Sequence, residues 1–240
     1  MFIGGFQKFT LLDYPGKIAA VVFTMGCNFR CPYCHNPEIV DPKKINYGNK
    51  IETEEVLKFL GSRKNDLDGV CITGGEPTLQ PGLVEFVKRI KELGFLVKID
   101  TNASHLRIIK DLSEKKLVDY WAVDLKTSPK KYEVLTRKDN VAENIGASID
   151  LITKSNAEME LRTTVAPGIV GIDDFDEMIK WINKINPETF SKLYRYSVQD
   201  FKPETTLDEE FGKVKPYSKE DLEIIADKIK KHCGNVVVLD

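Results

Sequence analysis

Three cysteines lie close together in the segment GCNFRCPYCHNP, residues 26–37. Cys31 and Cys34 have the C-x-x-C spacing of a redox dithiol, and His35 extends it to the C-x-x-C-H pattern of covalent haem attachment. With Cys27, the segment could instead bind zinc through three thiolates and an imidazole, or an iron–sulfur cluster through three thiolates alone. The spacing by itself leaves these four chemistries open.

The rest of the chain favours the cluster. A glutaredoxin-like dithiol leaves Cys27 without a role, and haem attachment requires export, whereas the first residues do not have the pattern of a signal peptide. Zinc binding would require the neighbouring side chains of Cys34 and His35 to reach one ion, which is a strained arrangement. Three thiolates can ligate three irons of a [4Fe–4S] cube and leave the fourth iron open to a small molecule.

The composition is that of a globular protein. Of 240 residues, 42% are hydrophobic and 30% are charged, and the net charge of -2 gives no sign of a nucleic-acid or membrane surface. No apolar run is long enough to span a membrane. Because the first residues also do not have the pattern of a signal peptide, we expect a cytoplasmic protein. In that reducing compartment, five cysteines, three of them clustered, indicate metal or redox work rather than disulfides.

Apolar segments alternate along the chain with amphipathic ones. The pattern predicts strands at residues 18–24, 68–74, 95–101, 120–126, 158–167 and 192–201. It predicts helices at residues 53–64, 81–94, 105–117, 140–155, 173–185 and 218–232. Six strand–helix units imply a parallel sheet with right-handed crossovers, two units short of a closed eight-stranded barrel. We therefore expect an α/β fold, a partial (β/α)6 TIM-like open barrel with parallel strands.

The chain is expected to form one domain. No linker, low-complexity segment or sequence repeat divides residues 1–240. Within this domain, residues 1–17 are an N-terminal extension ahead of the first predicted strand, and residues 235–240 are a closing strand-like segment.

Polar motifs follow the predicted strands. The cysteine loop comes after the first strand, GGEP (74–77) ends the second, DTN (100–102) the third and DLK (124–126) the fourth, while Arg162 lies on the fifth. The loops at the C-terminal ends of parallel strands converge in barrels of this kind. We therefore expect these residues to form one site.

The spacing C-x3-C-x-aromatic-C, with Tyr33 as the aromatic residue, and the downstream motif Gly-Gly-Glu-Pro together resemble the radical S-adenosylmethionine (SAM) superfamily. The resemblance implies that Cys27, Cys31 and Cys34 hold one [4Fe–4S] cluster whose open iron binds SAM. It also implies reductive cleavage of SAM into methionine and a 5′-deoxyadenosyl radical, with Tyr33 packed beside cluster and cofactor. Residues 38–55 contain no cysteine, so a second cluster is not expected there.

The same resemblance assigns SAM contacts to residues at the ends of the next strands. Gly74 and Gly75 would present backbone to the methionine end of SAM, since glycine lets backbone approach a ligand closely. Glu76 would help to hold the SAM ammonium group, directly or through neighbouring backbone. The other implied contacts, to the carboxylate or ribose of SAM, come from Lys126, Arg162 and, at the ribose, Asn102.

A monovalent cation beside the SAM carboxylate is a further implication of the resemblance. Asp100, Thr101 and Asp124 would supply its ligands, because hard cations prefer oxygen. The cation would also offset the negative charge of neighbouring carboxylates. The alternative role for each of these residues is a salt bridge or hydrogen bond at a strand end.

A narrower resemblance covers almost the whole chain. The opening GGFQKFTLLDYPGK and the C-x3-C-x2-C-H-N core resemble glycyl-radical-enzyme activases, more specifically the activating proteins of anaerobic ribonucleoside-triphosphate reductase. This implies a partner glycyl-radical enzyme as protein substrate, which loses a hydrogen atom from a glycine, and an electron donor such as flavodoxin or ferredoxin. Asp13 would lie near the partner's glycine loop, although an ordinary turn ahead of Pro15 and Gly16 is the alternative.

Two other functions stay open. One is a radical SAM enzyme that acts on a small molecule or an RNA base, although the neutral charge balance speaks against RNA. The other is a non-catalytic metal or redox module built on the same cysteines. Cys71 is expected to be a buried apolar residue, and Tyr194 and Tyr196 to lie in the core or the barrel lining, where they could face a substrate channel.

Overall fold

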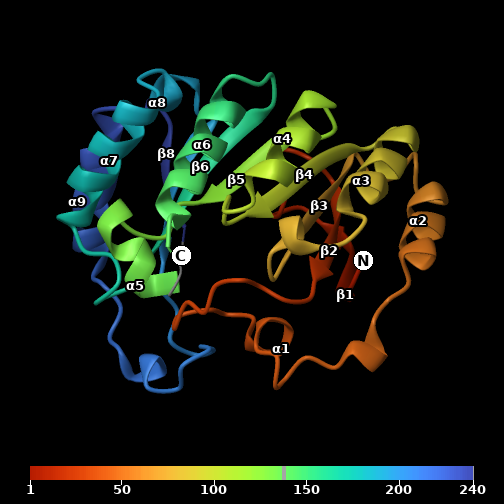
Figure 1. Cartoon of the computed structure of the whole chain (residues 1–240), viewed down its shortest axis with the longest axis horizontal. Coiled ribbons are helices and arrows are strands. Elements are labelled where there is room, and N and C mark those ends of the chain that lie inside the picture. The colour runs from red at the N-terminus through yellow and green to blue at the C-terminus, as the bar shows by residue number, and fades with distance from the viewer. Residues whose placement is uncertain (137–138, 240) are drawn as a thin grey trace.

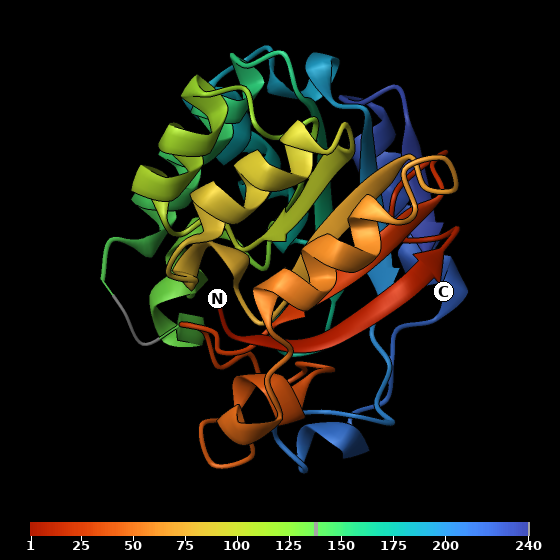
Figure 2. The same cartoon turned by 90° about the vertical axis from the view of Figure 1, so that its right-hand side faces the viewer.

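The computed structural model describes residues 1–136 and 139–239, and it contains one curved sheet wrapped on its outer side by helices (Figures 1 and 2). Asp240, the last residue of the expected closing segment, lies outside the described residues. The strands follow one another in chain order, and seven of the eight are parallel. The predicted α/β open barrel is confirmed.

The eight strands include every strand that the sequence pattern predicts. Their bounds are β1 (Ile3–Thr10), β2 (Ala19–Thr24), β3 (Gly69–Gly74), β4 (Leu96–Thr101), β5 (Tyr120–Asp124), β6 (Glu158–Val165), β7 (Arg195–Asp200) and β8 (Val236–Leu239). The strand β8 coincides with the expected closing segment and pairs with β7 in parallel. Predicted and observed ends differ by at most three residues, which is the usual uncertainty of such boundaries.

In the described residues, the longer helices lie on the outer face of the sheet, as Figures 1 and 2 show. They are α2 (Thr53–Gly61), α3 (Leu83–Glu92), α4 (Leu106–Glu114), α6 (Val141–Thr153), α7 (Asp174–Ile185) and α9 (Lys219–Lys230). Shorter α-helices lie in the loops, namely α1 (Pro37–Val40), α5 (Tyr132–Thr136) and α8 (Thr189–Lys192). In the part of the chain that the structure describes, no helix is long and apolar enough to cross a membrane.

The first strand, β1, was not predicted, because residues 1–17 were expected only as an extension. Its sequence IGGFQKFT contains two glycines, which weaken the strand signal. The structure pairs β1 antiparallel to β2, with Gln7 opposite Val21. In the loop after β1, Tyr14 packs against Tyr120 of β5, with ring centroids 5.8 Å apart. Pairing with β2, rather than local propensity, makes this segment a strand.

A buried acid links three strands near their N-terminal ends. Glu160 on β6 is 1% exposed and accepts hydrogen bonds from the hydroxyls of Tyr120 on β5 and Ser197 on β7. Its carboxylate also lies 3.1 Å from the guanidinium Nε of Arg195. A buried carboxylate is stable only with such partners, so this network fixes the spacing of β5, β6 and β7 below the candidate site.

We predict that Glu160→Ala lowers the free energy of unfolding by about 3 kcal/mol, because it leaves Arg195 and two hydroxyls without their acceptor. The measurement is urea denaturation. Glu158→Ala, on the same strand but exposed, is the matched control and should change the free energy by less than about 0.5 kcal/mol. Equal effects of the two substitutions would contradict the prediction.

Candidate active site

A cavity of about 270 Å³ lies where the loops after the parallel strands converge. The structure brings all fourteen residues that the sequence suggested for the site into its wall. These are Asp13, Cys27, Cys31, Tyr33, Cys34, Gly74, Gly75, Glu76, Asp100, Thr101, Asn102, Asp124, Lys126 and Arg162. Their convergence follows from the parallel order of the strands, whereas their individual roles stay predictions.

The three thiols of the cysteine loop are free and line the cavity. The backbone N–H of Phe29 donates to Cys27 Sγ at 3.3 Å, and the Arg30 guanidinium donates to the carbonyl oxygens of Cys27 and Phe29. Burial, assisted by the charge of Glu76, raises the pKa of Cys27 to about 12, and burial also raises the pKa of Cys31 and Cys34. Thiolates therefore need a cationic group among them, as bound iron would provide.

Two glycines let the loop after β3 lie directly against the start of the cysteine loop. The N–H of Gly75 donates to the Thr24 carbonyl and the N–H of Glu76 donates to the Gly26 carbonyl, both at 2.8 Å. A Cβ on Gly75 would lie 2.0 Å from the Gly26 oxygen. Gly74 has a φ of +111°, and a Cβ there would lie 2.4 Å from the Thr24 nitrogen. Only glycine fits at either position.

Glu76 is buried, with 1% of its surface exposed, and its carboxylate is fully engaged within the protein. One oxygen accepts from the backbone and hydroxyl of Thr78 and from the hydroxyl of Thr101, and the other accepts from the Asn102 backbone N–H at 2.8 Å. Glu76 therefore connects the loops after β3 and β4. Of its two expected roles toward the SAM ammonium, this geometry favours the indirect one, through neighbouring backbone.

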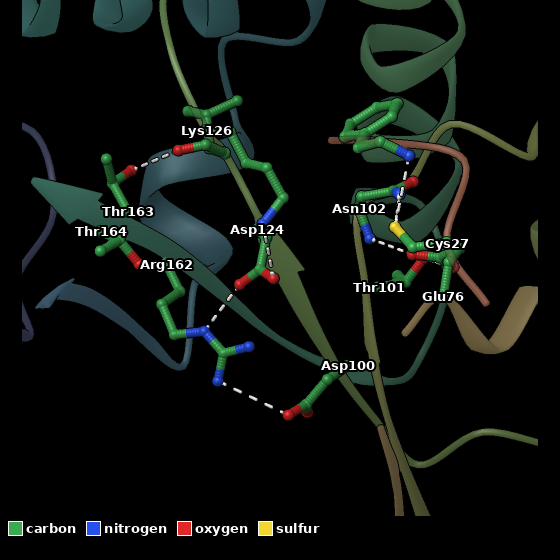
Figure 3. Close-up of polar contacts among 12 residues, drawn as sticks. Cys27, Glu76, Asp100, Thr101, Asn102, Asp124, Lys126, Arg162, Thr163 and Thr164 are labelled. Carbon is green, nitrogen blue, oxygen red and sulfur yellow. Dashed lines mark hydrogen bonds and ion pairs between the residues drawn. The ribbon is translucent and has the colours of Figure 1, made fainter. Parts of the chain in front are cut away.

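Asn102 extends the connection to the cysteine loop. Its side-chain N–H donates to Asn28 Oδ1 at 2.9 Å and lies 3.9 Å from Cys27 Sγ, as Figure 3 shows in part. Its side-chain oxygen accepts from the backbone and hydroxyl of Ser104. The amide is therefore held rigidly beside the first thiol.

Charged side chains occupy the opposite side of the cavity (Figure 3). Arg162 Nε donates to Asp124 at 2.7 Å, and its Nη1 lies 3.5 Å from Asp100. Lys126 Nζ donates to Asp124 at 3.2 Å. Burial opposes ionisation of Asp124, but the charges of Arg162 and Lys126 outweigh it and hold the pKa of Asp124 well below its usual range. The carboxylate is therefore ionised and aligns both cationic groups.

The residues expected to bind a monovalent cation have partners within the protein. Asp124 is bonded to Arg162 and Lys126, and Thr101 donates its hydroxyl to Glu76. Asp100 forms a buried ion pair with Lys98, a residue that the sequence interpretation did not use. The salt-bridge and hydrogen-bond alternatives are what the structure contains, and the cation site stays an untested prediction.

The segment 201–214, which follows β7, packs over the cysteine loop and was also missed. The N–H of Asp208 donates to the Pro32 carbonyl at 3.0 Å. The ring of Phe211 lies 6.2 Å from that of Tyr33, between ring centroids. Figures 1 and 2 show this segment crossing near α1, far from it in sequence. It carries no motif, so only the tertiary structure reveals it.

The suggestion that Tyr194 and Tyr196 could face a substrate channel is not supported. Neither lines the cavity, whereas Gln199 on β7 does. Tyr196 is buried, bonds to Thr163 and stacks on Phe190, 6.5 Å between centroids. The alternation of side chains along β7 explains why Gln199 lines the cavity and Tyr196 does not. Ser197 and Gln199 point to the inner face of the sheet, and Tyr196 points to the outer face.

Comparison with known proteins agrees with this geometry. The sequence profile of the radical SAM superfamily matches residues 21–182. A Methanocaldococcus jannaschii protein, provisionally named a glycyl-radical enzyme activating enzyme, is 34% identical over 98% of this chain and 95% of its own. The pyruvate formate-lyase-activating enzyme of Streptococcus mutans is 28% identical over 82% of this chain and 78% of its own. The chain therefore belongs to the radical SAM superfamily, and within it to the activase group.

Structural comparison supports the fold alone. The crystal structure of Streptococcus suis SuiB bound to SAM matches 90% of this chain with a TM-score of 0.67 and 17% sequence identity. This chain covers 48% of the length of SuiB. The shared part is the open barrel.

Because the chain belongs to the radical SAM superfamily, its cofactors are a [4Fe–4S] cluster and SAM. The residues of the cavity fit both, since three free thiols line it, two glycines leave backbone accessible and the cationic side chains of Lys126 and Arg162 line it. Within residues 1–136 and 139–239, no three His, Cys, Asp or Glu side chains are arranged to hold a single metal ion.

We predict that Gly75→Ala weakens SAM binding by more than about tenfold, because its Cβ would force the loop away from the Gly26 carbonyl 2.0 Å away. Equilibrium binding to the cluster-loaded protein measures this effect. Gly61→Ala is the control, since nothing lies within 4 Å of its Cβ, and it should bind SAM normally. Normal binding by Gly75→Ala would show that the close approach is not required.

Proposed function

We propose that this protein activates a glycyl-radical enzyme, with anaerobic ribonucleoside-triphosphate reductase as the partner. In the balanced reaction, one electron and one SAM yield methionine, and a hydrogen atom passes from the partner's glycine to give 5′-deoxyadenosine and a glycyl radical. Flavodoxin or ferredoxin is the proposed electron donor. We assign the reaction to the cytoplasm, where reductants keep thiols free.

The observation that carries the proposal is the position of Asp13. This residue belongs to the N-terminal segment that resembles activases, and it lines the same cavity as Cys27, Cys31 and Cys34. Its carboxylate accepts a hydrogen bond from the Thr10 hydroxyl at 2.5 Å, which holds it in place. An activase requires that a protein segment reach the cavity that holds SAM, and a fixed carboxylate in the wall can bond to backbone N–H groups of such a segment.

The surface beside Asp13 suits a protein substrate. Leu11 is 62% exposed and Leu12 is 88% exposed, directly before the carboxylate. Exposed apolar side chains next to a cavity are common where another protein binds. We assign this turn, rather than a small-molecule pocket, to contact with the partner's glycine loop.

The cavity residues would bind and orient SAM. The bound cluster, held by Cys27, Cys31 and Cys34, would supply the electron for SAM cleavage. Backbone at Gly74 and Gly75 would receive the methionine end, and Tyr33 would pack beside it. The carboxylate and ribose of SAM would contact the remaining side chains, Lys126, Arg162 and Asn102. The segment 201–214 would help to exclude water from the cysteine loop.

A direct test of the proposal uses the cysteines. Replacing Cys27, Cys31 or Cys34 by Ala should abolish formation of 5′-deoxyadenosine and of the glycyl radical, because each thiolate holds one iron. The measurements are chromatography of the nucleoside and electron paramagnetic resonance of a mixture with the reductase, SAM and reductant. Cys233→Ala, whose thiol bonds to the Asn235 carbonyl, is the control and should keep both signals.

Two outcomes would contradict the proposal in different ways. SAM cleavage without a glycyl doublet from any candidate partner would exclude the activase function and leave a small-molecule substrate. A doublet with another glycyl-radical enzyme, but none with the reductase, would exclude only the proposed partner.

A second test concerns the partner contact. Asp13→Asn keeps the shape of the side chain and removes its charge, so we expect the dissociation constant for the partner to rise about tenfold and the radical yield to fall. Calorimetry and spin quantification measure these two quantities. Asp227→Asn, an exposed aspartate on α9, should leave both unchanged. If Asp13→Asn behaves like Asp227→Asn, the carboxylate has only a turn-forming role.

A further inference from the structure

The buried ion pair between Lys98 and Asp100 lies where the resemblance implies a monovalent cation. Lys98 and Asp100 are two residues apart on β4, so both side chains point from the inner face of the sheet. The Lys98 side chain is 4% exposed and that of Asp100 is 11% exposed. An ammonium group is therefore enclosed in the barrel directly beside one of the proposed cation ligands.

The surroundings of the Lys98 ammonium resemble a cation site. Besides the Asp100 carboxylate, Nζ lies 3.7 Å from Cys71 Sγ and 5.9 Å from the centre of the Tyr120 ring. A carboxylate, a thiol and an aromatic face all attract a positive charge. The positive charge that the two carboxylates need is thus already supplied by the chain.

The charges of this bonded network disfavour an additional cation. Among residues 1–136 and 139–239, three cationic side chains, Lys98, Lys126 and Arg162, contact only two carboxylates, those of Asp100 and Asp124. One positive charge is left within the network. A further cation in this partly buried network would be repelled by its excess positive charge. A carboxylate such as that of SAM would instead balance that charge.

Lys98 also controls the position of Arg162. Asp100 contacts Lys98 through one oxygen and Arg162 through the other, at 3.5 Å for the second contact. Asp100 thereby transmits the position of the ammonium to the guanidinium that faces the cavity. Lys98 does not line the cavity itself, so it is a positioning residue for SAM binding.

We propose that the Lys98 ammonium is a built-in cation that replaces a bound monovalent ion, so that SAM binding by this protein does not depend on potassium or sodium. The proposal rests on the SAM site and on no property of the partner protein. It replaces the cation that the family resemblance implied at Asp100, Thr101 and Asp124.

The first experiment needs no substitution. The dissociation constant for SAM is measured on the cluster-loaded wild-type protein in potassium chloride, sodium chloride and choline chloride at equal ionic strength. We expect values within about twofold of one another, because choline is too large to enter a cation site and none is needed. Tighter binding in potassium or sodium by about tenfold or more would overturn the proposal.

Substitution of Lys98 should make SAM binding depend on potassium. In choline chloride, Lys98→Met should bind SAM about tenfold more weakly than wild type. Asp100 loses its ion pair with Lys98, and the position of Arg162, which contacts Asp100, is then no longer fixed. Potassium should recover most of the loss and should raise the melting temperature of the cluster-loaded variant, but not that of wild type. Lys98→Ala leaves more space and serves as the second variant if Lys98→Met does not fold.

Lys91→Met is the matched control. It removes another lysine–aspartate pair, in which Lys91 Nζ lies 2.6 Å from a partly exposed Asp119 outside the cavity. Its SAM affinity should match wild type in every salt. A Lys98 variant that binds SAM normally in choline, or that potassium does not restore, would overturn the proposal. Because SAM binding is measured without a partner, these outcomes are independent of whether a glycyl radical forms.

Discussion

The carboxylate of Glu76 ties together the loops that form the candidate active site. It accepts from Thr78 in its own loop and from Thr101 and Asn102 at the end of β4, and Asn102 bonds onward to Asn28 in the cysteine loop. Burial raises the pKa of this acid, and the hydrogen bonds from the surrounding donors reduce that rise without cancelling it. Because a buried acceptor without donors is costly, the three loops must keep their positions together.

The cavity has two electrically different sides. On one side are thiols, glycine backbone and the buried acid, and on the other are the cationic groups around Asp100 and Asp124, as Figure 3 shows in part. This division suits a zwitterionic ligand, whose ammonium and carboxylate need opposite surroundings. Arg162 is central, because it bridges two carboxylates from neighbouring strands. The parallel order of β4, β5 and β6 makes that bridge possible.

Local periodicity was enough to predict most elements, because strands and helices bury side chains with periods that neighbouring residues define. It failed at β1, where two glycines hide a strand that forms by pairing with β2. The expectation that Tyr196 lies in the core is confirmed, since its ring is buried against Phe190, but an alternating strand does not say which of its two faces lines a site until the sheet curves around it. The segment 201–214 contacts the cysteine loop through long-range packing that no local pattern encodes.

The sequence by itself determined the chemistry, because the spacing of Cys27, Cys31 and Cys34 and the Gly74–Gly75 pair are short-range features that a cluster and SAM require. It also indicated that strand-end residues would meet, since parallel topology brings such ends together. Only the tertiary structure decided how the charges of those residues are neutralised. Alternation along β4 places Lys98 on the same face as Asp100, but their pairing depends on both side chains being enclosed by the barrel.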